Sequence, residues 1–144
     1  MSVELLKLYS SVDRMLKMNL EGITHADSIK HIDNTNSINW IVGHMVVSRN
    51  GVLNLMGLPP IAPDKIKAVY ERGSKMMTDM NNAENLDTLV KLFDESQKKI
   101  VEGVANVKDD QVKEKLVFLG LHEGYHAGQV ATMRKLLGKE SAIK

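Results

Sequence analysis

The stretch Leu121-His122-Glu123-Gly124-Tyr125-His126-Ala127-Gly128-Gln129-Val130 places two histidines four positions apart in a segment with helical spacing. Residues four apart lie one above the other on a helix face, so the imidazoles of His122 and His126 can converge on one point. Upstream, His44 in the segment 38–45 is the best third ligand. Three neutral histidines without a thiolate are typical of a metal site that keeps one coordination position open. The pattern therefore predicts a metal site made of His44, His122 and His126.

Around these histidines, apolar residues recur at the spacing of helices. The pattern predicts long helices over residues 3–20, 37–56, 86–104 and 109–137, and a short helix over 63–70. Ser37 (with Asn36 as the alternative) and Asn85 are the predicted N-caps of the second and third long helices, because their side-chain oxygens can accept a first-turn amide. The second helix is expected to turn His44 toward the core together with Trp40 and Ile41.

The segments between the long helices set the expected topology. The polar run Thr24 to Ser37 is predicted to be a long loop, and residues 57–82 an irregular connection. A connection of that length can carry the chain from one end of a bundle back to the other. No segment alternates with period two for long enough to form a strand. We therefore expect one all-α domain over residues 1–144, a four-helix bundle with up-down-down-up topology and a crossover between helices two and three.

Composition limits the class of partner. The chain has 144 residues, with 19 lysines and arginines against 18 aspartates and glutamates, and neither charge is gathered into a long block. This balance predicts neither a nucleic-acid nor a membrane partner. The sequence contains no cysteine, so any thiol chemistry needs a thiol from another molecule. The segment 1–10 does not resemble a signal peptide or a membrane span. We expect a soluble, cytoplasmic protein.

The histidines also fit roles other than the predicted metal site. A histidine in a helical core can be a hydrogen-bonding group without a metal, although burying three imidazoles together would leave several ring nitrogens in need of partners. His25 and His31 lie in the polar loop and are predicted to have surface or turn roles. Residues 122–126 also match the H-E-x-x-H pattern of zinc proteases. The extended pattern requires glycine at 129 and histidine at 132, where this chain has Gln129 and Thr132, so a protease is disfavoured.

The blocks Asn36-Ser37-Ile38-Asn39-Trp40-Ile41-Val42-Gly43-His44 and His122-Glu123-Gly124-Tyr125-His126-Ala127-Gly128-Gln129 together resemble the DinB-like family of four-helix-bundle proteins. This family includes thiol-dependent enzymes such as the bacillithiol transferases, and the resemblance covers most of the chain. It implies a metal held by His44, His122 and His126, a crossover between the second and third helices, and frequently a homodimer. Ala127 departs from the basic residue that many relatives carry after the last histidine.

These observations lead to an expected chemistry with alternatives. Zinc or nickel is the expected metal, and its affinity is expected to fall as the pH drops through about 6.5, because the imidazoles must be neutral. The expected reaction transfers a small external thiol to an electrophilic small molecule. Metal-activated water at the same site would give a hydrolase, and a protein without turnover would be a metal or small-molecule binding protein. Loops 23–37 and 57–82 are expected to shape the pocket, with Tyr125 and Gln129 as candidate pocket residues.

Overall fold

The computed structural model describes residues 2–74 and 80–143. Within these ranges the protein is all-α, and no residue is in a strand. Its elements are α1 (Val3–Leu20), α2 (His25–Ser28), α3 (Ile38–Leu55), α4 (Asp64–Tyr70), the 3-10 helix η1 (Met80–Asn82), α5 (Leu86–Val104) and α6 (Asp110–Leu136). The predicted all-α class and the long helices are confirmed, with bounds that differ from prediction by at most one residue.

Helix starts follow the capping residues that the sequence offers. The side chain of Ser37 accepts a hydrogen bond from the Trp40 amide, and Asn85 accepts one from the Asp87 amide. Asp109 accepts from two first-turn amides of α6. Each cap satisfies backbone donors that have no partner inside the helix. The predicted caps at Ser37 and Asn85 are therefore confirmed.

The predicted loop over residues 24–37 contains a short helix that the sequence analysis missed. Thr24 and Asp27 form a reciprocal capping box that starts α2, a single turn. The hydrogen bond from the Thr24 amide lowers the pKa of Asp27 to about 2. In the connection 57–82, the predicted helix over 63–70 is present as α4, whereas η1 was not predicted and residues 75–79 lie outside the described part.

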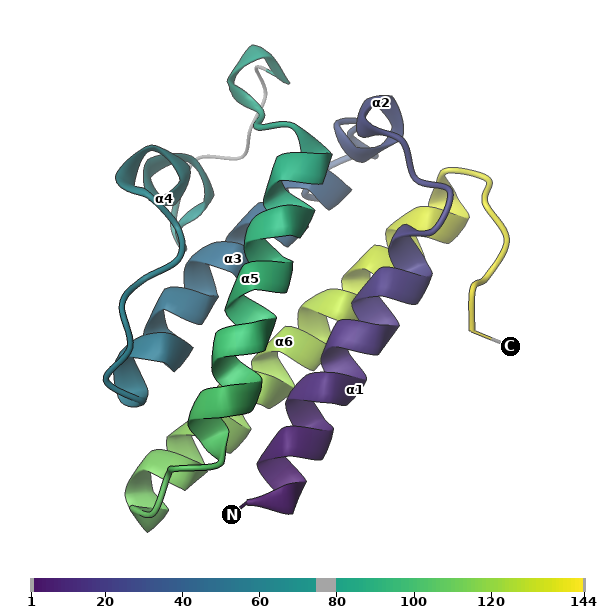
Figure 1. Ribbon diagram of the computed structural model, residues 1–144. Helices are drawn as coiled ribbons and strands as arrows, with labels where there is room; N and C mark the ends of the chain where they lie inside the picture. The colour runs from purple at the N-terminus through teal and green to yellow at the C-terminus, as the bar shows by residue number, and fades with distance from the viewer. Residues whose placement is uncertain (1, 75–79, 144) are drawn as a thin grey trace.

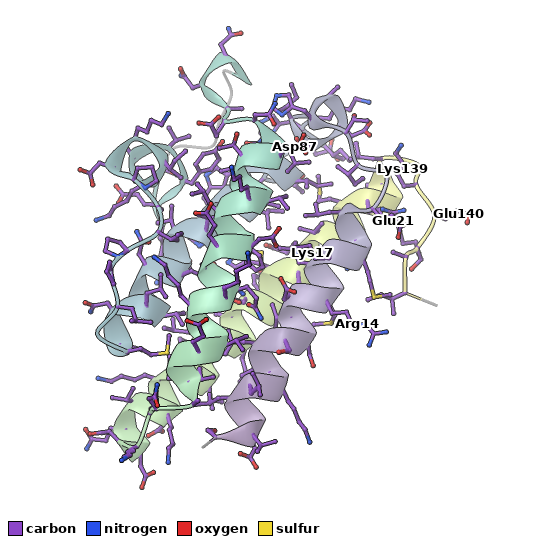
Figure 2. The ribbon with its side chains drawn as sticks, in the orientation of Figure 1. Arg14, Lys17, Glu21, Asp87, Lys139 and Glu140 are labelled. Atoms are coloured by element: carbon purple, nitrogen blue, oxygen red, sulfur yellow. The ribbon has the colours of Figure 1, made fainter. Side chains whose placement is uncertain are left out.

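The four long helices pack against one another. α1 contacts α5 and α6, and α3 contacts the same two helices. In Figure 1, α3 and α5 both start at the upper end of the molecule, where α2 lies, whereas α1 and α6 both start at the lower end. α4 packs on the outer side of α3. Figure 2 shows charged side chains such as Arg14 and Glu140 pointing away from the shared interior.

Helix α3 is the most enclosed element. Every residue from Ile38 to Met45 is buried, because α2, α4, α5 and α6 all contact this helix. A helix covered on several sides is apolar around most of its circumference rather than along one stripe. The first half of α3 therefore places His44 in the interior, 5% exposed. No helix in the described ranges combines the length and apolar character needed to cross a membrane.

Candidate metal centre

The structure brings the three predicted histidines together. His44 projects from α3, and His122 and His126 project from α6. One ring nitrogen from each lies within 4.8 Å of the other two, and this cluster could hold a metal ion. The ring planes of each pair are steeply inclined, by 69°, 72° and 86°, so the three rings converge from different directions.

The two histidines of α6 are already at ligand spacing. Their Nε2 atoms lie 3.1 Å apart. A zinc–nitrogen bond of about 2.0–2.1 Å in tetrahedral geometry separates two ligating nitrogens by about 3.3 Å. The observed separation therefore suits two imidazoles that share one ion.

Hydrogen bonds fix the orientation of two of the three rings. His44 Nδ1 lies 2.9 Å from the Tyr70 carbonyl oxygen, and His126 Nδ1 lies 2.7 Å from Gln129 Oε1. Both oxygens can only accept, so each Nδ1 carries the proton and each Nε2 presents a lone pair. Partners of this kind orient metal-binding histidines and raise their basicity. The third ring, that of His122, has a buried Nδ1 without a hydrogen-bond partner among the described residues.

Burial favours the neutral form of two of the three histidines, His126 and His44. It lowers the pKa of His126 to about 4, although the hydrogen bond with Gln129 opposes the change. Burial also lowers the pKa of His44, against the opposing hydrogen bond to the Tyr70 carbonyl. The pH at which these two ligands would take up protons therefore lies below the value of about 6.5 that an unperturbed imidazole gives.

Trp40 and Tyr70 hold His44 from two sides. The indole ring of Trp40 stacks on His44, with ring centroids 4.7 Å apart and planes inclined by 8°. Tyr70 supplies the carbonyl, and its hydroxyl donates to Asn39 Oδ1 at 2.7 Å while accepting from the Glu84 amide. The connection 57–82 therefore supports the centre through Tyr70, as a backbone acceptor rather than a ligand.

The absence of a side chain at Gly43 allows the Tyr70 ring to pack closely against α3. A Cβ atom built at position 43 would lie 2.3–2.6 Å from three carbons of the Tyr70 ring. We expect Gly43→Ala to destabilise the protein by about 1–3 kcal/mol, because the ring must move and has no free space. We also expect weaker metal binding, since the displaced residue supplies the carbonyl that orients His44. Urea unfolding and a chelator-competition titration measure the two effects.

Gly51→Ala is the matched control, because Gly51 lies in the same helix with no atom within 4 Å of an added Cβ. This variant should gain about 0.5–1 kcal/mol from helix propensity and bind metal as the wild type does. Equal stability of the Gly43→Ala and Gly51→Ala proteins would contradict the steric argument.

Glu123 does not face the histidine cluster. It is 1% exposed and forms a two-pronged ion pair with Arg49, with Nε–Oε1 at 2.9 Å and Nη2–Oε2 at 3.0 Å. Arg49 is fully buried, donates through Nη1 to Ser96 Oγ and the Phe93 carbonyl, and covers the Phe93 ring at 3.5 Å. Burial raises the pKa of Glu123, and the guanidinium beside it opposes that rise. This carboxylate is held by Arg49 and is not free to act as the general base of a protease.

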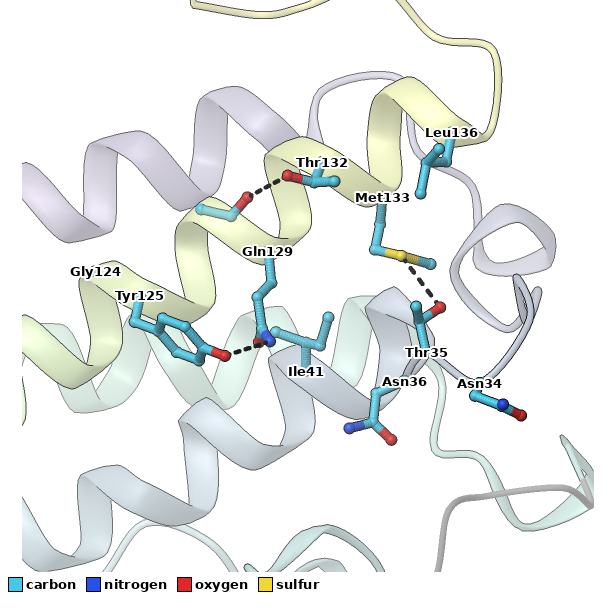
Figure 3. Close-up of a pocket in the computed structure, with 11 residues that line it drawn as sticks. Asn34, Thr35, Asn36, Ile41, Gly124, Tyr125, Gln129, Thr132, Met133 and Leu136 are labelled. Atoms are coloured by element: carbon cyan, nitrogen blue, oxygen red, sulfur yellow. Dashed lines mark hydrogen bonds between the residues drawn. The ribbon is translucent and has the colours of Figure 1, made fainter.

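The remaining sequence candidates lie outside the cluster. His25 Nδ1 accepts a hydrogen bond from the Leu86 amide at 3.2 Å, and so serves the start of α5. His31 Nδ1 lies 3.2 Å from the Thr35 carbonyl. Gln129 connects His126 to Tyr125, since its Nε2 donates to the Tyr125 hydroxyl at 3.2 Å (Figure 3). Arg49, Gly43 and the Tyr70 carbonyl are the contributions that the sequence analysis did not anticipate.

The low pKa of His126 has a consequence for the stability of the metal-free protein. The unfolded chain takes up a proton on His126 near pH 6.5, whereas the folded chain does so only near pH 4. The contribution of this difference to the free energy of unfolding is therefore complete above pH 6.5 and is lost as the pH falls toward 4. We expect His126→Gln to reduce the proton uptake on unfolding at pH 5.5 by about one proton. Urea unfolding between pH 7.5 and 4.5 measures this slope, and the same slope in both proteins would contradict the assignment.

Comparisons of this chain with protein-family models, with curated proteins and with solved structures give no match.

Proposed function

We propose that this protein is a DinB-like four-helix bundle that holds one divalent metal, zinc or nickel, through His44, His122 and His126, and that it transfers a small external thiol to an electrophilic small molecule. The observation that carries the proposal is the convergence of three imidazole rings, two of them oriented by acceptors on Nδ1. When bound, the metal would supply Lewis acidity that lowers the pKa of a thiol. The arrangement of α1, α3, α5 and α6 supports the up-down-down-up topology with its crossover.

Thiol transfer is favoured over hydrolysis by the surroundings of the site. A metal-dependent hydrolase usually needs a general base within reach of the attacking water. The nearest carboxylate in sequence, Glu123, is instead paired with Arg49 in the core. A thiol needs no such base once its pKa is low, because the thiolate is itself the nucleophile. The chain contains no cysteine, so the thiol comes from a second molecule.

The proposed reaction forms a sulfur–carbon bond and breaks two bonds, the S–H bond of the thiol and the bond from carbon to the leaving group. The thiol loses its proton to solvent, its sulfur forms a bond to the electrophilic carbon, and the leaving group departs with its bonding electron pair. Incubation of the zinc-loaded or nickel-loaded protein with a panel of low-molecular-weight thiols and model electrophiles tests this. Conjugation that is lost in His126→Ala is the expected result. Hydrolysis of the electrophile without conjugation, or no turnover across the panel, would overturn the thiol transferase.

We also propose a homodimer, through a stripe on α6. Phe118, Leu121 and Tyr125 lie three and four residues apart on this helix and are 69%, 61% and 64% exposed. Large apolar side chains gathered on one helix face mark an interaction surface. We expect Phe118→Glu to convert a dimer, of twice the 16.1 kDa chain mass, into a monomer in light scattering at micromolar concentration. Val101→Glu on α5 is the control and should leave the dimer intact. A wild-type mass of 16.1 kDa would contradict the proposal.

A further inference from the structure

A cavity of about 740 Å³ begins beside the metal centre at Gly124 and Tyr125, and lies between α6, the start of α3 and the loop before it (Figure 3). Tyr125 and Gln129 form its end nearest His126. This volume is within the range of about 300–1,000 Å³ that small-molecule sites occupy. The cavity therefore has the size and the position of a substrate site for the centre.

The wall of this cavity carries no charge. None of the described residues that line it is an aspartate, glutamate, lysine, arginine or histidine. Its polar groups are neutral amides and hydroxyls, among them Asn34, Asn36 and Thr132. A charged ligand would lose water here without gaining an opposite charge, which is costly. With no metal ion at the adjacent centre, the wall therefore discriminates against both anions and cations.

Polar and apolar groups are arranged along its length. Asn34 and Asn36, in the loop before α3, supply neutral side-chain amides to the cavity wall. Ile41, Met133 and Leu136 supply apolar surface. From Tyr125 to Leu136 the helix advances 11 residues, or about 16 Å at about 1.5 Å per residue. The cavity suits an elongated molecule with an apolar body and an uncharged polar group.

We infer that this cavity binds the electrophilic substrate and that this substrate is an uncharged, elongated, amphipathic small molecule. The substrate's role rests on the proposed function, whereas its chemical class rests on the cavity wall. The cavity wall of the metal-free protein accepts neutral amides or alcohols on an apolar chain and rejects carboxylates and ammonium ions of the same shape.

Gly128 offers a way to close the cavity without disturbing the fold. It lines the cavity, and a Cβ added at this position would meet no atom within 4 Å. Gly128→Leu therefore places a side chain in open space and raises helix propensity. Gly51→Leu in α3 is the matched control, because that glycine also lies inside a helix with no atom within 4 Å of an added Cβ.

The test uses three probes of one shape, 4-phenylbutanamide, 4-phenylbutanoate and 4-phenylbutylammonium, titrated into metal-free protein at pH 7 and followed by amide NMR, because a bound metal ion would itself attract the carboxylate. We expect the amide to bind with a Kd on the order of 1 mM, as befits a fragment, and to shift the amide signals of Gly128 and Thr132. Each charged probe should bind at least about tenfold more weakly. Gly128→Leu should abolish binding of the amide, and Gly51→Leu should not change it.

Three results would overturn the inference: no binding of the amide, equal or tighter binding of a charged probe, or unchanged binding to Gly128→Leu. These outcomes are separate from a failure of the proposed function. If the amide binds as expected but no thiol conjugation occurs, the assignment of the ligand as an electrophile falls together with the transferase. If conjugation occurs but the amide does not bind, the cavity is not the substrate site.

Discussion

His126→Ala is expected to lower the affinity of the protein for zinc by more than about 100-fold. Loss of a residue that only orients a ligand already costs about 10–100-fold, and here the ligand itself is removed. His44→Ala should have an effect of similar size, because its ring supplies the third nitrogen and is the only one that comes from α3. Elemental analysis after dialysis, with chelator-competition titrations, measures the affinity. The same variants should lose the conjugation activity.

The control for this prediction is His25→Ala. This histidine is outside the cluster and accepts a hydrogen bond from the Leu86 amide. Its variant should keep the wild-type metal content, although the start of α5 loses an acceptor. Circular dichroism must show that all variants are folded. Metal content that is unchanged in both His44→Ala and His126→Ala would remove the basis of the proposed function.

The parts of the structure that depend on local sequence could be predicted. Helix bounds follow from capping residues and apolar spacing, and the pairing of His122 with His126 follows from their separation of four. The choice of His44 as third ligand also placed the right residue in the cluster. The DinB-like family and the up-down-down-up topology remain predictions.

The parts that depend on contacts between distant segments could not be predicted. The Tyr70 carbonyl belongs to the backbone and carries no signal in the side-chain pattern, and the close packing of Gly43 depends on where α4 lies. The sequence does contain one signal from which the buried ion pair could have been predicted. Arg49 lies three residues from both Val46 and Val52 on a buried face of α3, and a charge in such a position indicates a partner in the core.

That partner, Glu123, leads to the largest stability effect we expect. Glu123→Gln keeps the shape of the side chain but leaves the buried Arg49 guanidinium without a counter-charge, which should destabilise the protein by about 3–5 kcal/mol. Urea unfolding measures the change. Lys17 and Asp94 form an ion pair at the surface, so Asp94→Asn is the matched control and should cost less than about 1 kcal/mol. Similar losses of unfolding free energy in the two variants would show that the buried ion pair stabilises the protein no more than the surface pair does.

The double variant Arg49→Met with Glu123→Leu separates the contribution of the ion pair to protein stability from its effect on the positions of the histidine ligands. Apolar side chains of similar volume often replace a buried ion pair at no cost, and Ser96 still donates to the Phe93 carbonyl at 2.6 Å. We therefore expect most of the stability to return.

The Arg49–Glu123 pair also joins α3 to α6, the two helices that carry the ligands, and its two parallel hydrogen bonds fix the relative position of these helices. We expect the double variant to bind zinc about tenfold more weakly than the wild type and to show an altered Co²⁺ absorption spectrum. Full recovery of both stability and metal affinity would mean that packing alone sets the distance between His44 and the histidines of α6.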